Sequence, residues 1–202
     1  MDGSLDHERD SIDAEKFLAA LESELFFSDD LRMAIETARS GVPAKSKLDC
    51  VLRDTIKHYD EGYDWTFTRG MILRNYGHAD CTNMYQNLGF ILISLLYGNG
   101  DFRETIRLGL ACGYDTDCIC ATASSILGII RGAKCLLHEN GMSDTGLAIE
   151  IGTKRKNGSI ADLARDVCAV GISACSTFND TIVITECPEL LLRSDCHAPD
   201  SD

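Results

Sequence analysis

The 202-residue sequence has little proline and tryptophan, three and one residues respectively, and aromatic residues make up only 7% of it. No apolar run approaches the ~20 residues that a membrane-spanning helix needs. Basic residues are scarce relative to acidic ones, which leaves a net charge of −13. Because phosphate groups bind clustered cations, this balance disfavours nucleic acid and membrane surfaces as partners. The length and the 45% hydrophobic content are typical of one globular domain.

The acidic residues gather at the two ends of the chain. Residues 1–30 contain ten acidic and two basic residues, and residues 186–202 contain five and one. The stretch between them is almost neutral, so we expect it to carry the chemistry. We interpret both ends as solvated segments rather than interaction tails. The sequence thus predicts an acidic segment with one amphipathic helix at 1–27, a helical domain at 28–185 and a flexible acidic tail at 186–202.

A secretory signal is missing, since the first residues form neither a basic nor an apolar region. Ten cysteines are too sparse for a disulfide scaffold, so we expect a reducing, cytoplasmic compartment in which most cysteines are small buried residues. Cys112, Cys118 and Cys120 form C-x₅-C-x-C, and His78 with Cys81 forms H-x-x-C. Neither spacing matches paired C-x₂-C zinc motifs, which favours structural roles for these cysteines.

Helical periodicity runs through most of the chain, with apolar residues three and four apart. The segment from Cys118 to Ala133 is apolar on nearly every side and is expected to be the central helix. Residues 138–158 are expected to form a loop, and Thr181–Thr185 a short strand or the start of a buried helix. The sequence therefore predicts an all-α fold. The expected helices begin at or next to Asp13, Ser28, Ser46, Trp65, Asn83, Asp101, Cys118 and Ser159.

The most informative segment is Gly113-Tyr114-Asp115-Thr116-Asp117-Cys118, just ahead of the expected central helix. Residues two apart in a regular helix point about 200° away from each other, so Asp115 and Asp117 converge only in an irregular turn. Converging carboxylates form a hard oxygen site suited to Mg²⁺ or Ca²⁺. The same D-x-D pattern also serves as a helix N-cap, and the spacing alone leaves both interpretations open.

This segment and its surroundings resemble the ADP-ribosylglycohydrolase family. The resemblance rests on Asn83, on the Leu95–Phe102 stretch with its G-x-G-D-F motif, on the G-x-D-T-D signature at 113–117 and on Gly128–Ala133. It covers about residues 28–175, and the order of the motifs makes it more specific than D-x-D alone. It implies a compact, orthogonal multi-helix all-α domain, of which this sequence would lack the upstream part.

The resemblance also implies a site for two Mg²⁺ ions, with Asp115 and Asp117 as ligands. Cys118 stands where the family commonly has a threonine whose hydroxyl binds metal. Because a thiol is a poor ligand for Mg²⁺, Cys118 is a weaker candidate, and we expect the metal to bind without it. The candidate substrate-binding residues are Asn83, Gly113, Tyr114 and Thr116.

The implied reaction is metal-assisted hydrolysis of the glycosidic bond at the distal ribose of ADP-ribose, releasing it from a protein or small molecule. The family's Thr-Asp-Asp ligands and its water-activating acid come from an upstream segment that we do not find here, so no catalytic residue is assigned. We interpret Ser28-Asp29-Asp30 as helix capping rather than as their substitute. The alternative is a non-catalytic relative or fragment that binds ADP-ribose or is a structural globular protein. Association with a separate N-terminal half is a further expectation.

Overall fold

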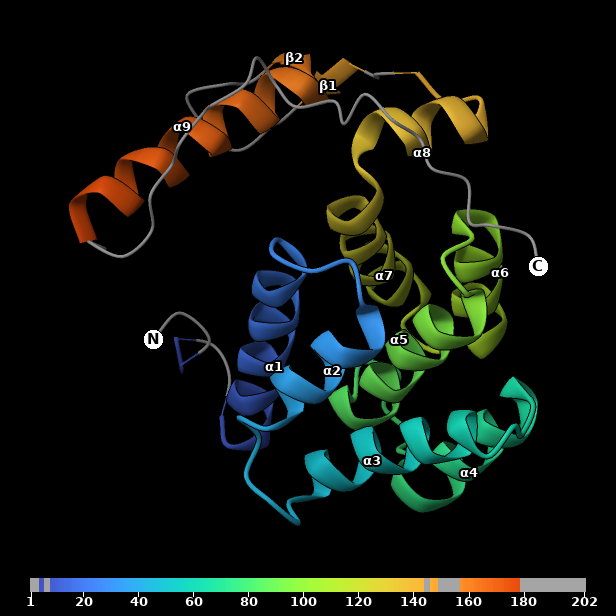
Figure 1. Ribbon diagram of the computed structural model, residues 1–202. Helices are drawn as coiled ribbons and strands as arrows, with labels where there is room; N and C mark the ends of the chain where they lie inside the picture. Colours follow the sequence, from blue (N-terminus) through green and yellow to red (C-terminus); the bar gives the residue numbers. More distant parts are fainter. Residues whose placement is uncertain (1–3, 6–7, 144–145, 149–156, 179–202) are drawn as a thin grey trace. The chain divides into compact units, whose positions relative to one another are not determined.

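The structure is a computed structural model that describes residues 4–5, 8–143, 146–148 and 157–178. The chain divides into two compact units, Met1–Arg131 and Gly132–Asp202. The predicted all-α fold is confirmed, since the described residues are mostly helical (Figure 1). The elements are α1 (Asp10–Leu25), α2 (Leu31–Arg39), α3 (Lys47–Asp60), α4 (Trp65–Tyr76), α5 (Met84–Gly98), α6 (Phe102–Cys112), α7 (Thr116–Arg131), α8 (Ala133–Asn140), β1 (Gly146–Ala148), β2 (Asn157–Ser159) and α9 (Ile160–Phe178).

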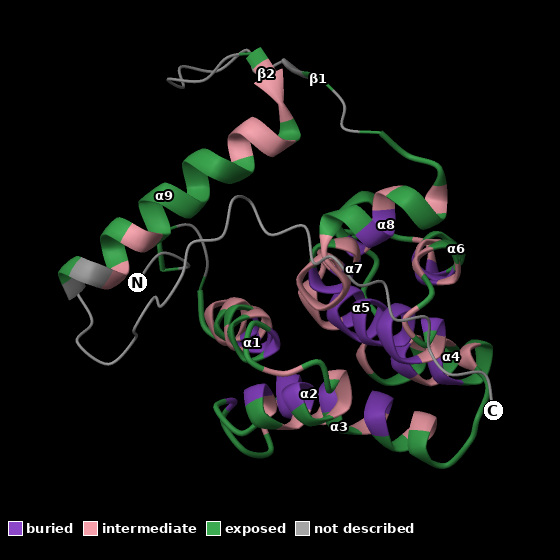
Figure 2. Ribbon diagram, turned by 45° about the horizontal axis from the view of Figure 1, so that its top comes forward, coloured by how far each residue is buried: buried purple, intermediate pink, exposed green. Residues whose placement is uncertain are grey.

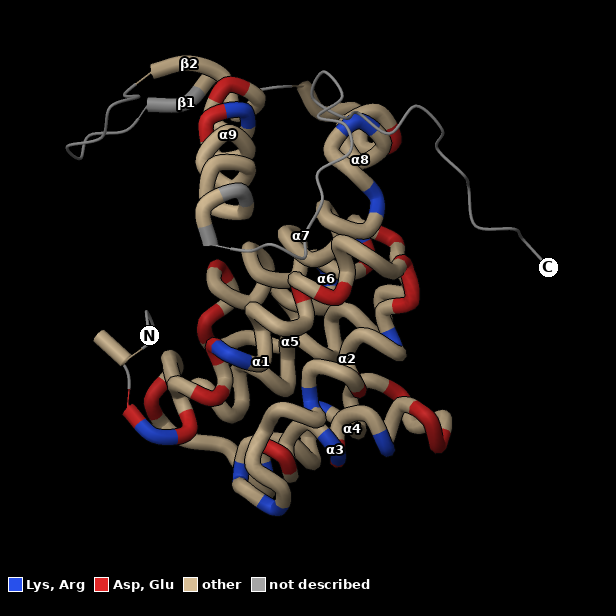
Figure 3. Tube along the Cα trace, turned by 60° about the vertical axis from the view of Figure 1, so that its left-hand side comes forward, with Lys and Arg blue, Asp and Glu red and all other residues tan. Residues whose placement is uncertain are grey.

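Helix α5 forms the centre of the larger unit. It contains no charged residue, twelve of its fifteen residues are buried, and α3, α4, α6 and α7 pack against it (Figures 2 and 3). The prediction that α7 is the central helix was wrong. Helix α5 buries many large apolar side chains, whereas only four of the sixteen residues of α7 are buried, namely Ile119, Ala123, Ile126 and Leu127. Burial stabilises in proportion to apolar area, so α5 takes the interior position.

Four helices begin at the caps that their sequences indicate. Each capping side chain accepts a hydrogen bond from a main-chain N–H in the first turn, at 2.7 to 3.2 Å. Such bonds satisfy donors that have no partner within the helix. The capping residues are Ser46 of α3, Asp64 of α4, Asn83 of α5 and Asp101 of α6.

Two predicted caps lie elsewhere. The cap of α2 is Asp30, whose carboxylate accepts from Met33 N at 2.9 Å, while the Ser28 hydroxyl accepts from Asp30 N. Both residue types cap helices equally well, so the sequence alone did not separate them. Helix α1 begins at Asp10, which places Asp13 in its first turn.

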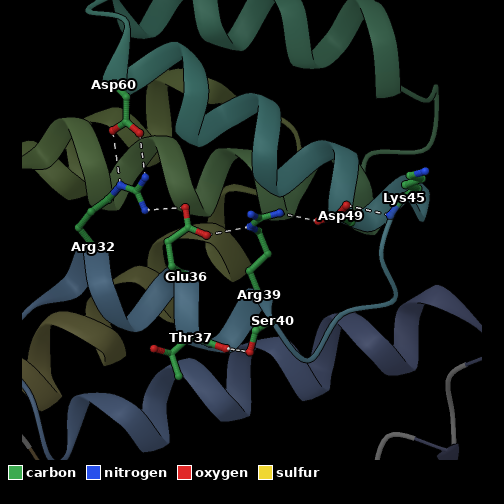
Figure 4. A network of polar contacts seen from close by, with 8 residues as sticks. All are labelled: Arg32, Glu36, Thr37, Arg39, Ser40, Lys45, Asp49 and Asp60. Carbon is green, nitrogen blue, oxygen red and sulfur yellow. Dashed lines mark hydrogen bonds and ion pairs between the residues drawn. The ribbon is translucent and has the colours of Figure 1, made fainter.

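A chain of alternating charges joins α2 to α3 (Figure 4). Arg32 donates to Asp60 at 2.8 Å and to Glu36 at 2.9 Å. Arg39 donates to Glu36 at 3.0 Å and to Asp49 at 2.7 Å. Acidic and basic residues are therefore interspersed on these helices rather than gathered into a patch of one sign (Figure 3).

In the smaller unit, the expected loop at 138–158 was partly wrong. Helix α8 extends to Asn140, and β1 pairs antiparallel with β2, with Gly146 opposite Ser159. Helix α9 begins next to Ser159 as expected, and Ser159 and Asp162 form a capping pair in which each side chain accepts from the other's main-chain N–H, at 3.1 and 3.0 Å. The Thr181–Thr185 segment lies outside the described residues. No single helix of the described part is long and apolar enough to cross a membrane.

The cysteines are less buried than predicted. Cys112 and Cys135 are buried, whereas Cys81, Cys118 and Cys168 are exposed. Cys135 is in a disulfide, and the other described cysteines are free thiols. The exposed thiols lie in a polar turn or on solvent-facing helix surfaces, where a small side chain can remain in water at little cost.

Candidate metal centre

A sharp reversal of the chain between α6 and α7 positions the G-x-D-T-D segment. Gly113 and Tyr114 both have positive φ, at 75° and 66°. This conformation is ordinary for glycine and costs a tyrosine roughly 1–2 kcal/mol. The Arg69 guanidinium of α4 donates to Cys112 O at 2.8 Å, and the Tyr114 ring contacts Phe90 of α5 with 5.8 Å between ring centroids. Helices α4 and α5 therefore hold the reversal in place.

Three potential metal donors converge where α7 begins. Ile119 N donates to Asp115 O at 3.0 Å, so Asp115 is the residue just before the helix, and Asp117 lies in its first turn. The donor atoms of Asp115, Asp117 and Cys118 all lie within 4.8 Å of one another. Asp115 is half-buried, and the other two residues are exposed. The two carboxylates converge because the helix starts between them.

The carboxylates also control the state of the neighbouring thiol. The hydrogen-bonding interaction with the Asp115 carboxylate, a slight loss of hydration, and the negative charges of Asp115 and Asp117 raise the pKa of the Cys118 thiol. A thiol of raised pKa is protonated at neutral pH and is a weak nucleophile. The arrangement therefore opposes covalent catalysis by Cys118.

The donor set suits a divalent cation, and it combines two hard carboxylates with one soft thiol. Two carboxylates are hard oxygen ligands of the kind that Mg²⁺ takes, and the thiol of Cys118 is not. Among the residues that the structure describes, this is the only group of three or more His, Cys, Asp or Glu whose donors converge. Asp115 and Asp117 also occupy positions where the dipole of α7 stabilises negative charge, so the N-cap interpretation remains compatible with the structure.

The other candidate residues fall into two groups. Gly113, Tyr114 and Thr116 adjoin the donors along the chain, and the Tyr114 side chain is 40% exposed. Asn83 instead caps α5, where its Oδ1 accepts from Tyr85 N at 3.2 Å. That local role accounts for its position at the start of the helix.

A cavity of about 250 Å³ lies near the C-terminal ends of α5 and α7, and no motif in the sequence predicts it. Its lining includes Asp29, Leu95 and Ile130. The sixteen residues of α7 span about 24 Å, and the donors lie at the opposite end of this helix. Asp29 is therefore far from Asp115, which supports the interpretation of Ser28-Asp29-Asp30 as a capping segment.

Comparison with models of known protein families shows the family to which this chain belongs. The family model for ADP-ribosylglycohydrolase matches residues 1–166. The chain belongs to the ADP-ribosylglycohydrolase family. The match includes all of α1 to α8 and the three converging donors, and it begins earlier than the resemblance noted at 28–175. No curated protein and no solved structure gives a match.

Proposed function

We propose that this ADP-ribosylglycohydrolase family member is a divalent-metal-dependent hydrolase of ADP-ribosylated proteins or small molecules. The observation that carries the proposal is the convergence of Asp115, Asp117 and Cys118 within 4.8 Å, inside the region that the family model matches. The bond cleaved is the glycosidic bond at the distal ribose. Mg²⁺ is the cation that the two carboxylates favour, and two ions are the family expectation.

A bound divalent cation supplies positive charge that acidifies water and stabilises charge developing in the transition state. Asp115 and Asp117 would hold it at the start of α7, and the Gly113–Tyr114 reversal fixes the position of Asp115. The exposed ring of Tyr114 offers an aromatic face for the ribose or the adenine. The cation would also offset the acidic charge of the chain toward an anionic diphosphate. We assign the water-activating acid to no residue of this chain.

One observation favours a second candidate, a non-catalytic relative that binds ADP-ribose. The described residues contain one group of converging donors, whereas the family resemblance implies a second set of ligands, Thr-Asp-Asp, from another segment. In that case the chain would bind ADP-ribose without turning over ADP-ribosylated substrates. Association with a separate N-terminal half would then be needed for activity.

The proposal is tested by replacing the ligands. Asp117→Ala and Asp115→Ala should each lower Mg²⁺-dependent release of ADP-ribose by about 100-fold or more, since even residues that only support metal ligands are worth about 10–100-fold. Release is measured on peptides ADP-ribosylated at serine, arginine or glutamate, with chelator-treated protein and added Mg²⁺. Asp13→Ala is the matched control because Asp13 is also an acid in a helix first turn.

The outcomes separate the two candidates. If Asp117→Ala and Asp13→Ala are equally active, hydrolysis does not depend on the metal site that contains Asp117. If the intact chain shows no turnover and calorimetry detects no Mg²⁺ binding, the hydrolase proposal fails. Binding of ADP-ribose in the absence of metal would then support the second candidate, a non-catalytic protein that binds ADP-ribose.

A further inference from the structure

We propose that Cys118 makes this centre selective for thiophilic divalent cations, so that Zn²⁺ binds through all three donors and displaces Mg²⁺. The inference rests on the metal site of the proposed function. It follows from the disagreement between the donor set and the hard cation that the family implies. Mg²⁺ would have two protein ligands here, Asp115 and Asp117, whereas Zn²⁺ would have three.

The geometry requires little movement to close around an ion. The three donor atoms already lie within 4.8 Å of one another. Ligands at Zn–S and Zn–O distances of roughly 2.0–2.3 Å in a tetrahedral site are about 3.5 Å apart. The donors therefore need to approach by about an ångström. Asp117 and Cys118 are exposed, so rotation of their side chains can supply this movement.

The thiol already points toward the carboxylates. Cys118 Sγ lies within 4.8 Å of a carboxylate oxygen of Asp115 and of one of Asp117, the two oxygens that would share the cation. A thiophilic ion would replace the thiol proton in this contact, and the proton would leave to solvent. The next cysteine differs, because Cys120 Sγ is directed to Ile106 O at 3.7 Å. Cys120 is therefore not a fourth ligand in this arrangement.

The donor set predicts opposite effects of one substitution on two metals. Cys118→Ser should lower the affinity for Zn²⁺ by about tenfold or more, because loss of a direct ligand costs at least as much as loss of a supporting residue. Mg²⁺ affinity should be unchanged or higher, since a hydroxyl is the harder donor. Cys81→Ser is the matched control, because Cys81 is an exposed free thiol in a different turn.

The experiment uses the full chain, reduced and freed of metal, and titrates it with Co²⁺ as a spectroscopic substitute for Zn²⁺. The intact chain and Cys81→Ser should develop a near-ultraviolet thiolate-to-Co²⁺ charge-transfer band, which Cys118→Ser should lose. Calorimetry with Zn²⁺ and with Mg²⁺ then measures the two affinities for each protein. Circular dichroism establishes that Cys118→Ser is folded, so that loss of the band reports on the ligand.

A band of equal intensity in Cys118→Ser, or equal Zn²⁺ affinity in both cysteine variants, would overturn the inference. Its failure is distinguishable from failure of the proposed function. Mg²⁺-dependent hydrolysis without a Cys118-dependent band would refute the role of Cys118 in Zn²⁺ binding and would support the proposed hydrolase function. A Cys118-dependent band without hydrolysis would support Cys118 as a metal ligand and would refute the proposed hydrolase function.

Discussion

Asp49 shows how this protein keeps a nearly buried charge. Its carboxylate accepts from Arg39 at 2.7 Å and from Lys45 N at 2.9 Å, and the residue is only 8% exposed. Burial by itself raises the pKa of Asp49, but the hydrogen bonds from Lys45 and Arg39 outweigh it and hold the pKa below its ordinary value. The ionised form is therefore the form that stabilises the fold.

We expect Asp49→Asn to destabilise the protein by about 1–3 kcal/mol at pH 7, because Arg39 loses a charged partner. The folded-state pKa is lowered, so this stabilisation is present above the ordinary value of about 3.9 and is lost as pH falls through the folded-state value. Urea unfolding measures the free energy of unfolding of the parent protein and of Asp49→Asn. The difference between them should be smaller at pH 3 than at pH 7. Glu104→Gln, which breaks an exposed pair with Arg107, should cost less stability than Asp49→Asn, because water screens the exposed pair. An unchanged difference at pH 3 would contradict the assignment.

Single residues also show which parts of the site the sequence could predict. Asp115, Asp117 and Cys118 are neighbours in the chain, so their convergence depends only on where one helix begins. The cavity beside Asp29 and Ile130 unites residues a hundred positions apart, and no local pattern predicts it. Local geometry was predictable because it depends on few dihedral angles, whereas the cavity depends on how whole helices pack.

At the scale of elements, glycines allow α5 and α6 to approach closely. A Cβ atom built on Gly98 would lie 2.1 Å from Thr105 Oγ1 and 3.0 Å from Thr105 Cα. Gly70 of α4 is different, because no atom lies within 4 Å of its Cβ position. The same substitution should therefore have opposite effects at the two positions.

Gly98→Ala should lower stability by about 1–3 kcal/mol through overpacking. Gly70→Ala should raise it by about 0.5–1 kcal/mol, because alanine is the better helix former. Thermal unfolding followed by circular dichroism should give Tm shifts of opposite sign. A Gly98→Ala protein as stable as the parent would show that α6 moves away without cost.

The predicted elements succeeded and failed for physical reasons. The helix expected at Trp65 begins there, where Asp64 caps its first turn. The helix at 133–140 was missed because Gly132, with φ of 76°, divides an apolar run that reads as continuous. The central position of α5 was missed because periodicity measures the faces of one helix and not its competition with others.

At the scale of the whole molecule, the hydrophobic core lies within Met1–Arg131. The continuous cluster of buried apolar residues runs from Ala14 to Leu127, and all of it belongs to this unit. Among the described residues of the other unit, only Cys135 and Leu136 are buried apolar residues. The larger unit therefore has what a domain needs to fold independently.

A chain ending at Arg131 should fold and keep the Cys118-dependent Co²⁺ band. Its circular dichroism should be helical, and its denaturant unfolding should be a single cooperative transition. Non-cooperative unfolding of the 1–131 chain would show that the core needs residues beyond it.

The packing of α1 has a kinetic consequence. Most packed helix pairs in the larger unit, such as α3 with α5 and α6 with α7, are near each other along the chain. Their contacts therefore require the closure of short loops only. Helix α1 also packs against α7, which requires the longest loop closure in the unit. Because closure entropy grows with loop length, the α3–α7 helices can associate early, and the docking of α1 is the late step of folding.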